Sequence, residues 1–373
     1  MSTTVSPPDP QLVEGLDEPL QILAPDGTRS PNGVLDDFLG EVDETLLTDM
    51  FIDMSVIRRI DNEAVALQRQ GELGLWAPLL GQEAAQVGLG RQLRDEDFIF
   101  PSYREHGLAY CRGVEPAEML SLWRGNTFCG WDPHERRMAA GQIIIGAQTL
   151  HAAGYAMATT FAGGEEVAVA CFGDGAISQG DVNEAMSFAS SFTAPVVFFC
   201  QNNQYAISEP VRVQTKEPIA LRPTGFGIPA MRVDGNDVLA MRAASAWATE
   251  HARSGAGPAF IEAVTYRMGA HTTTDDPKRY RDADELEYWR ARCPVLRLER
   301  HLEEVGAAIE TIREEAKIRA DAVAKELRAA ITSMTPPPPE NLFEHVYTGE
   351  HAGIARNRRR WEAFTASVAQ EAQ

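Results

Sequence analysis

Between Leu46 and Leu67 apolar residues recur every three or four positions, which is the spacing of one buried face of a helix. Gly71 and Gly74 follow this stretch and favour a helix end close to residue 70. The pattern therefore predicts one long amphipathic helix that packs its apolar face on the rest of the domain.

Three later runs, 167–172, 195–200 and 259–264, are almost entirely apolar and do not alternate with polar residues. Continuous apolar runs of this length are typical of strands that are buried on both faces, as in a parallel sheet covered by helices. Stretches of small residues at helical spacing lie between the runs, and one such helix is expected to open at Gly180. We predict an α/β fold, with a parallel sheet covered by helices on both faces.

The rest of the chain suggests three parts. Residues 1–40 are rich in proline, glycine and aspartate, and we expect an N-terminal arm or leader that is partly disordered. Residues 41–300 form the α/β domain. Residues 301–373 form a helical extension, because a charged amphipathic helix expected over 299–330 is followed by a proline-rich spacer at 335–340.

Charge narrows the possible partners. The net charge of the 373 residues is -20, so nucleic acid and anionic membrane surfaces would repel the protein. No signal peptide and no apolar stretch long enough to span a bilayer is visible in the sequence. The five cysteines form no C-x-x-C pair, so we expect neither a disulfide framework nor a zinc knuckle, and we expect a cytoplasmic protein.

The strongest chemical signal stands at the ends of two predicted strands. Gly173-Asp174-Gly175 follows the first buried run, and Asn202-Asn203 follows the second. Ligands of parallel α/β sheets bind beyond the carboxyl ends of the strands, where both motifs are expected. Alone, each motif is weak, because a G-D-G is usually a plain strand-to-helix turn; the pair at this spacing is what favours a site.

The residue types at these turns suit a magnesium diphosphate. Mg²⁺ takes about six oxygen ligands and few carboxylates. Asp174 can supply a carboxylate oxygen, Asn203 an amide oxygen, and a nearby backbone carbonyl, for which Tyr205 is the candidate, a third. The glycines of the first motif let the backbone approach phosphate closely.

Together the two motifs resemble the thiamine-diphosphate motif, and further segments make the chain similar to the alpha subunits of pyruvate and branched-chain 2-oxo acid dehydrogenases. The resemblance covers about residues 20 to 350. The supporting segments are Gly71–Gly74, Gly81–Ala84, Ser102–Gly107, Arg232–Asp237 and Tyr266–Thr272.

This resemblance implies thiamine diphosphate and Mg²⁺ as cofactors, with Asp174, Asn203 and the Tyr205 carbonyl as magnesium ligands. It implies that Arg104 grips the diphosphate and that His271 is the catalytic histidine. On residue type alone an isolated Tyr-Arg pair is usually a surface pair, and a loop histidine is usually solvated. The full set of cofactor-binding residues that we predict is Tyr103, Arg104, Ile143, Ile145, Gly173, Asp174, Gly175, Ala176, Asn203, Tyr205 and His271.

Two of the predicted residues have an alternative reading, and the chain differs from some relatives at two places. Ile143 and Ile145 are equally compatible with the wall of a cofactor site and with a simple core position. Some relatives carry arginine where this chain has Gln201, so the grip on the diphosphate is expected to differ. The segment 142–148 lacks the serine and threonine that some relatives use to bind potassium, and we do not predict that ion.

The resemblance also implies partners. The glutamate that activates the cofactor ring is expected on a separate beta subunit, since too little chain follows the α/β domain to form a second one. We therefore expect an α2β2 heterotetramer that meets the lipoyl domain of an acyltransferase component through the loop at 271–281. Thr272 in this loop matches a position where animal relatives carry a phosphorylated serine.

The expected reaction is oxidative decarboxylation of a 2-oxo acid with acyl transfer to the lipoyl group. We favour branched-chain 2-oxo acids over pyruvate, on the match around Arg232–Asp237 and the Thr-Asp-Asp run that ends at Asp276. Two alternatives stay open: a non-catalytic magnesium-phosphate binding module, and one half of a split transketolase-like enzyme, against which the loop at 271–281 argues.

Overall fold

A six-stranded parallel sheet lies at the centre of the computed structural model, which describes residues 13–344 and 346–371. Its strand order is β1-β7-β8-β4-β3-β2, and the strands with the three predicted apolar runs, β3, β4 and β8, lie side by side. Their carboxyl ends therefore meet at one edge of the sheet. The strands are β1 (Val13–Glu14), β2 (Phe98–Phe100), β3 (Ala168–Gly173), β4 (Val196–Asn202), β7 (Ala230–Asp234) and β8 (Ala259–Val264).

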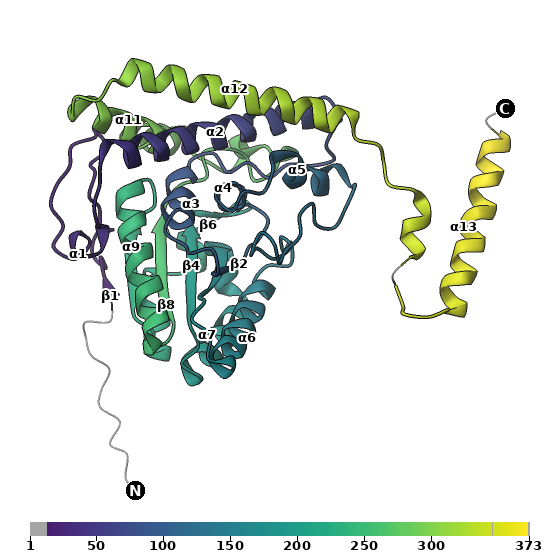
Figure 1. Cartoon of the computed structure of the whole chain (residues 1–373), viewed down its shortest axis with the longest axis horizontal. Coiled ribbons are helices and arrows are strands. Elements are labelled where there is room, and N and C mark those ends of the chain that lie inside the picture. The colour runs from purple at the N-terminus through teal and green to yellow at the C-terminus, as the bar shows by residue number, and fades with distance from the viewer. Residues whose placement is uncertain (1–12, 345, 372–373) are drawn as a thin grey trace, which may run out of the picture.

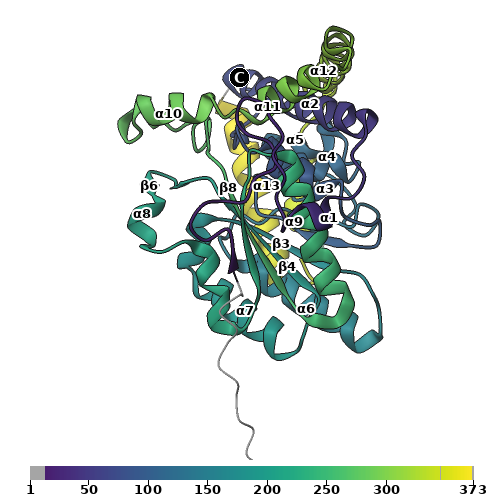
Figure 2. The ribbon, with the colours of Figure 1, turned by 90° about the vertical axis from the view of Figure 1, so that its left-hand side faces the viewer.

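Helices cover both faces of this sheet (Figures 1 and 2). Successive side chains of β3 enter two different cores: Val169 and Cys171 enter one, and Ala170 and Phe172 enter the other. This explains why the run is apolar throughout, and it confirms the predicted fold class. The first core includes residues of α2 (Glu44–Arg69), α3 (Glu83–Gly90) and α9 (Val238–His251), and the second includes residues of α6 (Ala147–Ala162) and α7 (Gly180–Ser191).

The long helix predicted from residue 46 is α2. The side chain of Asp43 caps its first turn by accepting a hydrogen bond from the Leu46 amide at 2.8 Å, which satisfies an otherwise free donor. Gly71 has a φ of 82°, a left-handed conformation that favours glycine directly after a helix. Gly71 therefore has the expected role at the end of the helix.

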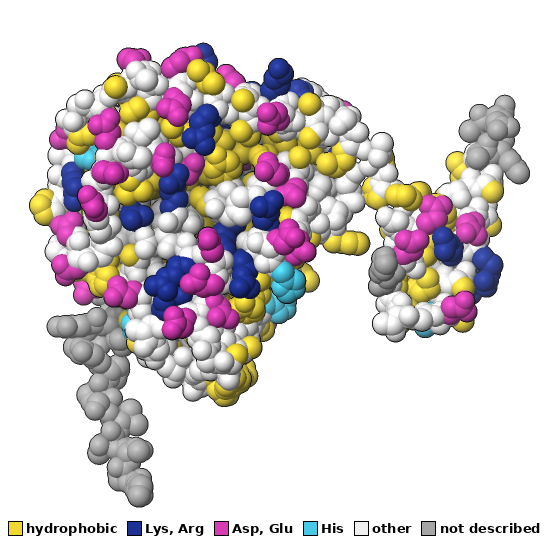
Figure 3. Space-filling model, viewed as in Figure 1, with side chains coloured by type: hydrophobic (Ala, Val, Ile, Leu, Met, Phe, Trp, Pro, Cys, Tyr) yellow, Lys and Arg dark blue, Asp and Glu magenta, His cyan; other side chains and the backbone are white. Residues whose placement is uncertain are grey.

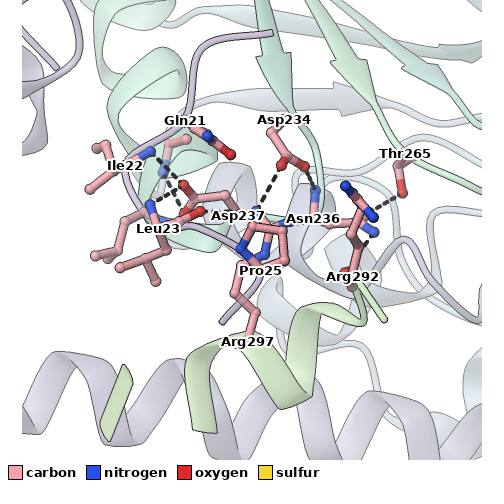
Figure 4. A network of polar contacts seen from close by, with 12 residues as sticks. Gln21, Ile22, Leu23, Pro25, Asp234, Asn236, Asp237, Thr265, Arg292 and Arg297 are labelled. Carbon is pink, nitrogen blue, oxygen red and sulfur yellow. Dashed lines mark hydrogen bonds and ion pairs between the residues drawn. The ribbon is translucent and has the colours of Figure 1, made fainter. Parts of the chain in front are cut away.

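The N-terminal part is more ordered than we expected. From residue 13 onward the chain enters the fold, because β1 pairs with β7, and Ile22 and Leu23 are fully buried. The Asp237 carboxylate accepts hydrogen bonds from both of their backbone amides, at 2.7 and 2.6 Å (Figure 4). The expectation of a partly disordered arm up to residue 40 is thus corrected for residues 13–40, and residues 1–12 lie outside the described part.

The single helix expected over 299–330 is two helices. α11 (Pro294–Glu304) ends before Gly306, whose φ of 81° cannot continue a helix, and α12 (Ile309–Ser333) follows. α12 runs along α2 at the top of Figure 1, so most of the expected extension belongs to the main body. Beyond the proline-rich spacer, α13 (Ala352–Glu371) stands apart from that body (Figure 1).

Shorter elements complete the fold. A small hairpin of β5 (Tyr205–Ala206) and β6 (Glu209–Pro210) follows the Asn202-Asn203 turn. Among the described helices, none has the length and apolar character needed to cross a bilayer. The remaining helices are α1 (Asp36–Leu39), α4 (His106–Cys111), α5 (Pro116–Arg124), α8 (Val211–Gln214) and α10 (Ala283–Arg290), and the short 3-10 turns are η1 (Asp174–Ser178), η2 (Ile219–Leu221), η3 (Pro223–Phe226), η5 (Pro277–Arg279) and η6 (Pro339–Phe343).

Candidate active site

A pocket of about 460 Å³ opens beyond the carboxyl ends of β3 and β4, where the two motifs were expected to meet. Its wall contains Asp174 from the end of β3 and Asn203 from the end of β4. All eleven cofactor-binding residues predicted from the sequence line this pocket. The structure therefore brings together residues from five separate segments of the chain.

Asp174 is the only carboxylate of the predicted metal ligands, and it is 2 % exposed. Burial raises its pKa to about 6, and a hydrogen bond of 3.0 Å from the Gln214 amide partly offsets that effect. A buried carboxylate with one neutral donor has oxygen lone pairs left for a cation. Desolvation thus disfavours the unpaired anion, and a bound metal would compensate for it.

Gly175 brings the turn after β3 against the hairpin that follows Asn203. A Cβ atom at this position would lie 2.8 Å from the Cβ of Ala206, closer than side chains tolerate. At Gly173, by contrast, the nearest atom to such a Cβ is 3.9 Å away. Gly175 is therefore required by the protein itself, whereas Gly173 leaves space that a ligand can occupy.

Asn203 and Tyr205 supply the two other predicted oxygens. The Asn203 side chain donates through Nδ2 to Gln82 at 3.2 Å, which fixes its Oδ1 as the acceptor side. That Oδ1 accepts the Tyr205 amide at 3.3 Å, and the Tyr205 carbonyl accepts from Arg267 Nη1 at 3.1 Å. Each oxygen retains a second lone pair for a metal. One carboxylate with an amide and a carbonyl oxygen is a donor set that suits Mg²⁺.

Three basic side chains converge on one side of the pocket. His271 Nδ1 lies 3.3 Å from Nη2 of Arg104 and 3.3 Å from Nη1 of Arg267. Both arginines are nearly buried, at 5 % and 1 % exposure, so their charges are weakly screened by water. Two guanidinium groups at a pocket wall form a strongly anion-attracting surface.

This environment fixes the protonation of His271. Burial, followed by the nearby charges of Arg104 and Arg267, lowers its pKa to about 4. The imidazole is therefore neutral at neutral pH, and its Nδ1 faces two donors, which leaves the proton on Nε2. The Asp275 carboxylate accepts the His271 backbone amide at 2.9 Å and keeps this part of the loop in place.

The apolar side of the pocket includes Ile143 and Ile145. Their exposed fractions are 64 % and 36 %, so they are not core residues, and both line the pocket. Tyr103 lies edge-on to the His271 ring with centroids 6.1 Å apart. These isoleucines leave this side of the pocket open to solvent in the described chain.

Gln201, which replaces an arginine of some relatives, does not face the pocket freely. Its Nε2 donates to Glu105 at 2.8 Å, and its Oε1 accepts from Gln86 at 2.9 Å. Gln86 in turn donates to the Arg104 carbonyl at 3.0 Å. Gln201 therefore anchors the segment that carries Arg104.

Sequence reasoning assigned no role to several residues that line the pocket. Arg267 was quoted only within a family segment, and it lies three positions beyond the end of β8. Gln148 is 1 % exposed, and its Oε1 is a buried acceptor without a hydrogen-bond partner in the described residues. A buried acceptor of this kind at a pocket wall indicates space for a ligand donor.

The comparison with protein-family models decides the family. The model of the dehydrogenase E1 component matches residues 52–340, which contain the sheet strands β2 to β8 and the whole pocket. The chain belongs to the dehydrogenase E1 component family. It is thus a component of a 2-oxo acid dehydrogenase, and the family depends on thiamine diphosphate.

Curated relatives of this E1 chain match over most of its length. The 3-methyl-2-oxobutanoate dehydrogenase subunit alpha of Mycobacterium tuberculosis (strain CDC 1551 / Oshkosh) is 44 % identical over 347 residues, 93 % of this chain and 94 % of the relative. The pyruvate dehydrogenase E1 component subunit alpha of Staphylococcus epidermidis (strain ATCC 35984) is 39 % identical over 316 residues, 84 % of each chain. That of Staphylococcus aureus (strain Mu50) has the same identity and coverage.

Proposed function

We propose that this E1 chain is the alpha subunit of a branched-chain 2-oxo acid dehydrogenase that binds thiamine diphosphate through Mg²⁺. The observation that carries the proposal is the meeting of Asp174 and Asn203 with Arg104 and His271 in one pocket. The oxygens of the first two suit Mg²⁺, and the guanidinium of the third suits a diphosphate. Asp174, Asn203 and the Tyr205 carbonyl would hold the metal.

When bound, thiamine diphosphate supplies the nucleophile and the electron sink for decarboxylation. The protein's contribution is to bind, orient and shield. Arg104 donates to the backbone carbonyl of His271 at 3.0 Å, so the residue that would grip the diphosphate also positions the histidine. Neutral His271, with its proton on Nε2, is able to donate that proton to an anionic oxygen in the pocket.

The active site is proposed to be completed by a beta subunit in an α2β2 heterotetramer. The exposed Ile143 and Ile145 support this, because one wall of the pocket has no cover within the described chain. The subunit names of the relatives agree with it. We further propose that the loop at 271–281 meets a lipoyl domain, and that the protein acts in the cytoplasm.

The choice of substrate rests on the comparisons. The relative named for 3-methyl-2-oxobutanoate has 44 % identity over 93 % of this chain, against 39 % over 84 % for those named for pyruvate. Pyruvate is the second candidate. A larger apolar substrate also suits a wall that contains Leu75, Trp123 and isoleucines.

The test is turnover by the purified alpha chain with its beta subunit, thiamine diphosphate and Mg²⁺. We expect decarboxylation with a higher kcat/KM for 3-methyl-2-oxobutanoate than for pyruvate, and none by the alpha chain alone. A preference for pyruvate would assign the chain to the second candidate. Binding of the cofactor without any turnover of 2-oxo acids by the assembled pair would contradict the enzymatic function.

A further inference from the structure

A small second cavity adjoins the active-site pocket. It measures about 30 Å³, and four residues line both it and the pocket: Ser102, Tyr103, Glu105 and Trp123. Residues that line two neighbouring cavities form the partition between them. Tyr103 and Trp123 are the aromatic members of this partition, and the Tyr103 ring lies edge-on to His271 with centroids 6.1 Å apart. The partition therefore stands beside the proposed catalytic histidine.

The lining of the small cavity is mainly apolar. Besides the shared residues it includes Ala109 of α4, Met119 of α5 and Met138. Figure 3 shows charged side chains of both signs spread over the visible face of the body, which is a different kind of surface. A cavity of this volume has room for about two water-sized groups, and methionine side chains adapt to the shape of an apolar guest. The space therefore suits methylene groups better than a charged ligand.

Trp123 lies in the last turn of α5 and is connected to the loop that carries His271. Its carbonyl accepts a hydrogen bond from the Gly74 amide at 3.0 Å. Two positions after Gly74, the Trp76 amide donates to the Thr273 hydroxyl at 3.1 Å, and the Trp76 carbonyl accepts the Thr273 amide at 2.9 Å. Trp123 therefore stands on the side of the pocket where the reacting carbon of a substrate is expected.

Ring contacts hold the indole of Trp123 in place. It lies edge-on to Trp76 with centroids 5.7 Å apart and to His106 at 6.4 Å, and the latter two rings stack on each other at 4.0 Å. Trp76 and His106 are buried, whereas Trp123 is half-buried and lines the pocket. The backbone at Trp123 has its own hydrogen bond with Gly74. A smaller side chain at this position would therefore open the partition and leave the path of the chain anchored.

We propose that Trp123 limits the length of the side chain that the enzyme accepts on its 2-oxo acid, because the indole closes the pocket off from the apolar cavity behind it. A short branched side chain ends in front of the indole, whereas a long unbranched chain collides with it. The inference rests on the proposed function for the class of substrate, and it adds the residue that restricts that class.

The variant Trp123→Leu tests the partition in the reconstituted complex of alpha and beta chains with thiamine diphosphate and Mg²⁺. The readout is the kcat/KM for 2-oxooctanoate divided by that for 3-methyl-2-oxobutanoate. We expect this ratio to rise about ten-fold or more, mainly through a lower KM for the longer acid, because methylene groups gain an apolar space. Trp123→Phe keeps an aromatic ring and should give a smaller rise. An unchanged ratio in whichever of the two variants folds would overturn the proposal.

Two further variants separate the cavity from a general loosening of the fold. Trp123→Leu/Ala109→Leu opens the partition but fills the cavity from α4, and we expect the ratio to return toward that of the unmodified chain. Trp247→Leu makes the same change at a half-buried tryptophan of α9 that does not line the pocket, and it should leave the ratio unchanged. A double variant that keeps the whole gain, or an equal gain in Trp247→Leu, would contradict the role of the cavity.

The activity of the unmodified complex separates this inference from the proposed function. If that complex turns over 3-methyl-2-oxobutanoate and its specificity is the same with leucine at position 123, the function stands and the role of Trp123 is overturned. If the unmodified complex turns over no 2-oxo acid, the proposed function is overturned instead.

Discussion

Nη2 of Arg104 lies 3.3 Å from Nδ1 of His271, although the two residues are 167 positions apart in the chain. Arg267, which precedes His271 by four positions, approaches the same nitrogen at 3.3 Å. A nitrogen that faces two guanidinium groups is an acceptor, so the imidazole carries its proton on Nε2. The geometry thus defines both the charge and the tautomer of the proposed catalytic histidine.

The first prediction concerns the titration of His271. Because burial and both arginines disfavour the imidazolium ion, the pKa is about 4, and the ring should stay neutral from pH 8 down to pH 5. Nitrogen-15 NMR of labelled protein should identify the Nε2–H tautomer. Replacement of Arg267 by methionine should raise the pKa, and a ring that titrates near pH 6.5 in the unmodified chain would contradict this environment.

The second prediction concerns Arg104. If its guanidinium binds the diphosphate, Arg104→Gln should weaken cofactor binding about 10- to 100-fold, the loss expected for charge-assisted hydrogen bonds. Arg104→Lys should recover only part of the affinity, because an ammonium lacks the planar fork. Calorimetric titration with thiamine diphosphate measures both. Arg94→Gln removes an exposed arginine with a long ion pair of 3.9 Å to Glu96, and as the control it should change nothing.

The third prediction compares two glycines. Gly175→Ala places a methyl group 2.8 Å from the Ala206 Cβ, so overpacking should destabilise the protein by about 1–3 kcal/mol. The methyl group of Gly173→Ala would enter open space, so the stability of the fold should stay nearly unchanged. The same methyl group should weaken binding of the cofactor that is proposed to fill that space. Thermal unfolding and cofactor titration of both variants separate these effects. Equal stability of the two variants would show that Gly175 has no packing role.

The fourth prediction uses His106, which stacks on Trp76 with ring centroids 4.0 Å apart and is buried. Desolvation lowers its pKa to about 3. The unfolded chain binds a proton below pH 6.5 and the folded chain does not, so its contribution to stability is full above pH 6.5 and is lost as the pH falls toward 3.

Denaturant unfolding of His106→Gln and the unmodified chain between pH 7 and 4 measures this contribution. The unmodified chain should lose up to about 1.4 kcal/mol per pH unit more than the variant below pH 6. The unmodified chain and the variant must be compared, because other groups also change the free energy of unfolding with pH. Asp61, whose pKa burial raises to about 6, stabilises the fold as the pH falls, which is opposite to the effect of His106. Parallel curves would mean that His106 takes up its proton without unfolding.

The sheet and the positions of Asp174 and Asn203 could be predicted because the signals lie within short stretches of the sequence. The run that became β3 is apolar at every position because its side chains enter two cores, and such a run carries its own signature. Asp174 and Asn203 directly follow their strands, so parallel strands that lie side by side bring them together. The same argument could not show Arg267, Gln82 or Gln148, which reach the pocket from three other segments.

The order of residues 13–40 could not be predicted, because it depends on contacts with residues that are distant in the sequence. Ile22 and Leu23 belong to a short, mostly apolar stretch, 20–24, that is surrounded by prolines, glycines and acids, a composition typical of a disordered leader. Their amides are bound by Asp237, more than 200 positions away, so the information lies in a tertiary contact. The break between α11 and α12 depends on a single glycine within an otherwise helical pattern.

The most direct test of the central claim is a titration of the reconstituted alpha and beta chains with thiamine diphosphate, with and without Mg²⁺, for the unmodified protein and Asp174→Ala. The account predicts binding that requires Mg²⁺ and that Asp174→Ala abolishes, while Asp321→Ala on the exposed side of α12 binds normally. Equal Mg²⁺-dependent affinity of a correctly folded Asp174→Ala chain would contradict it.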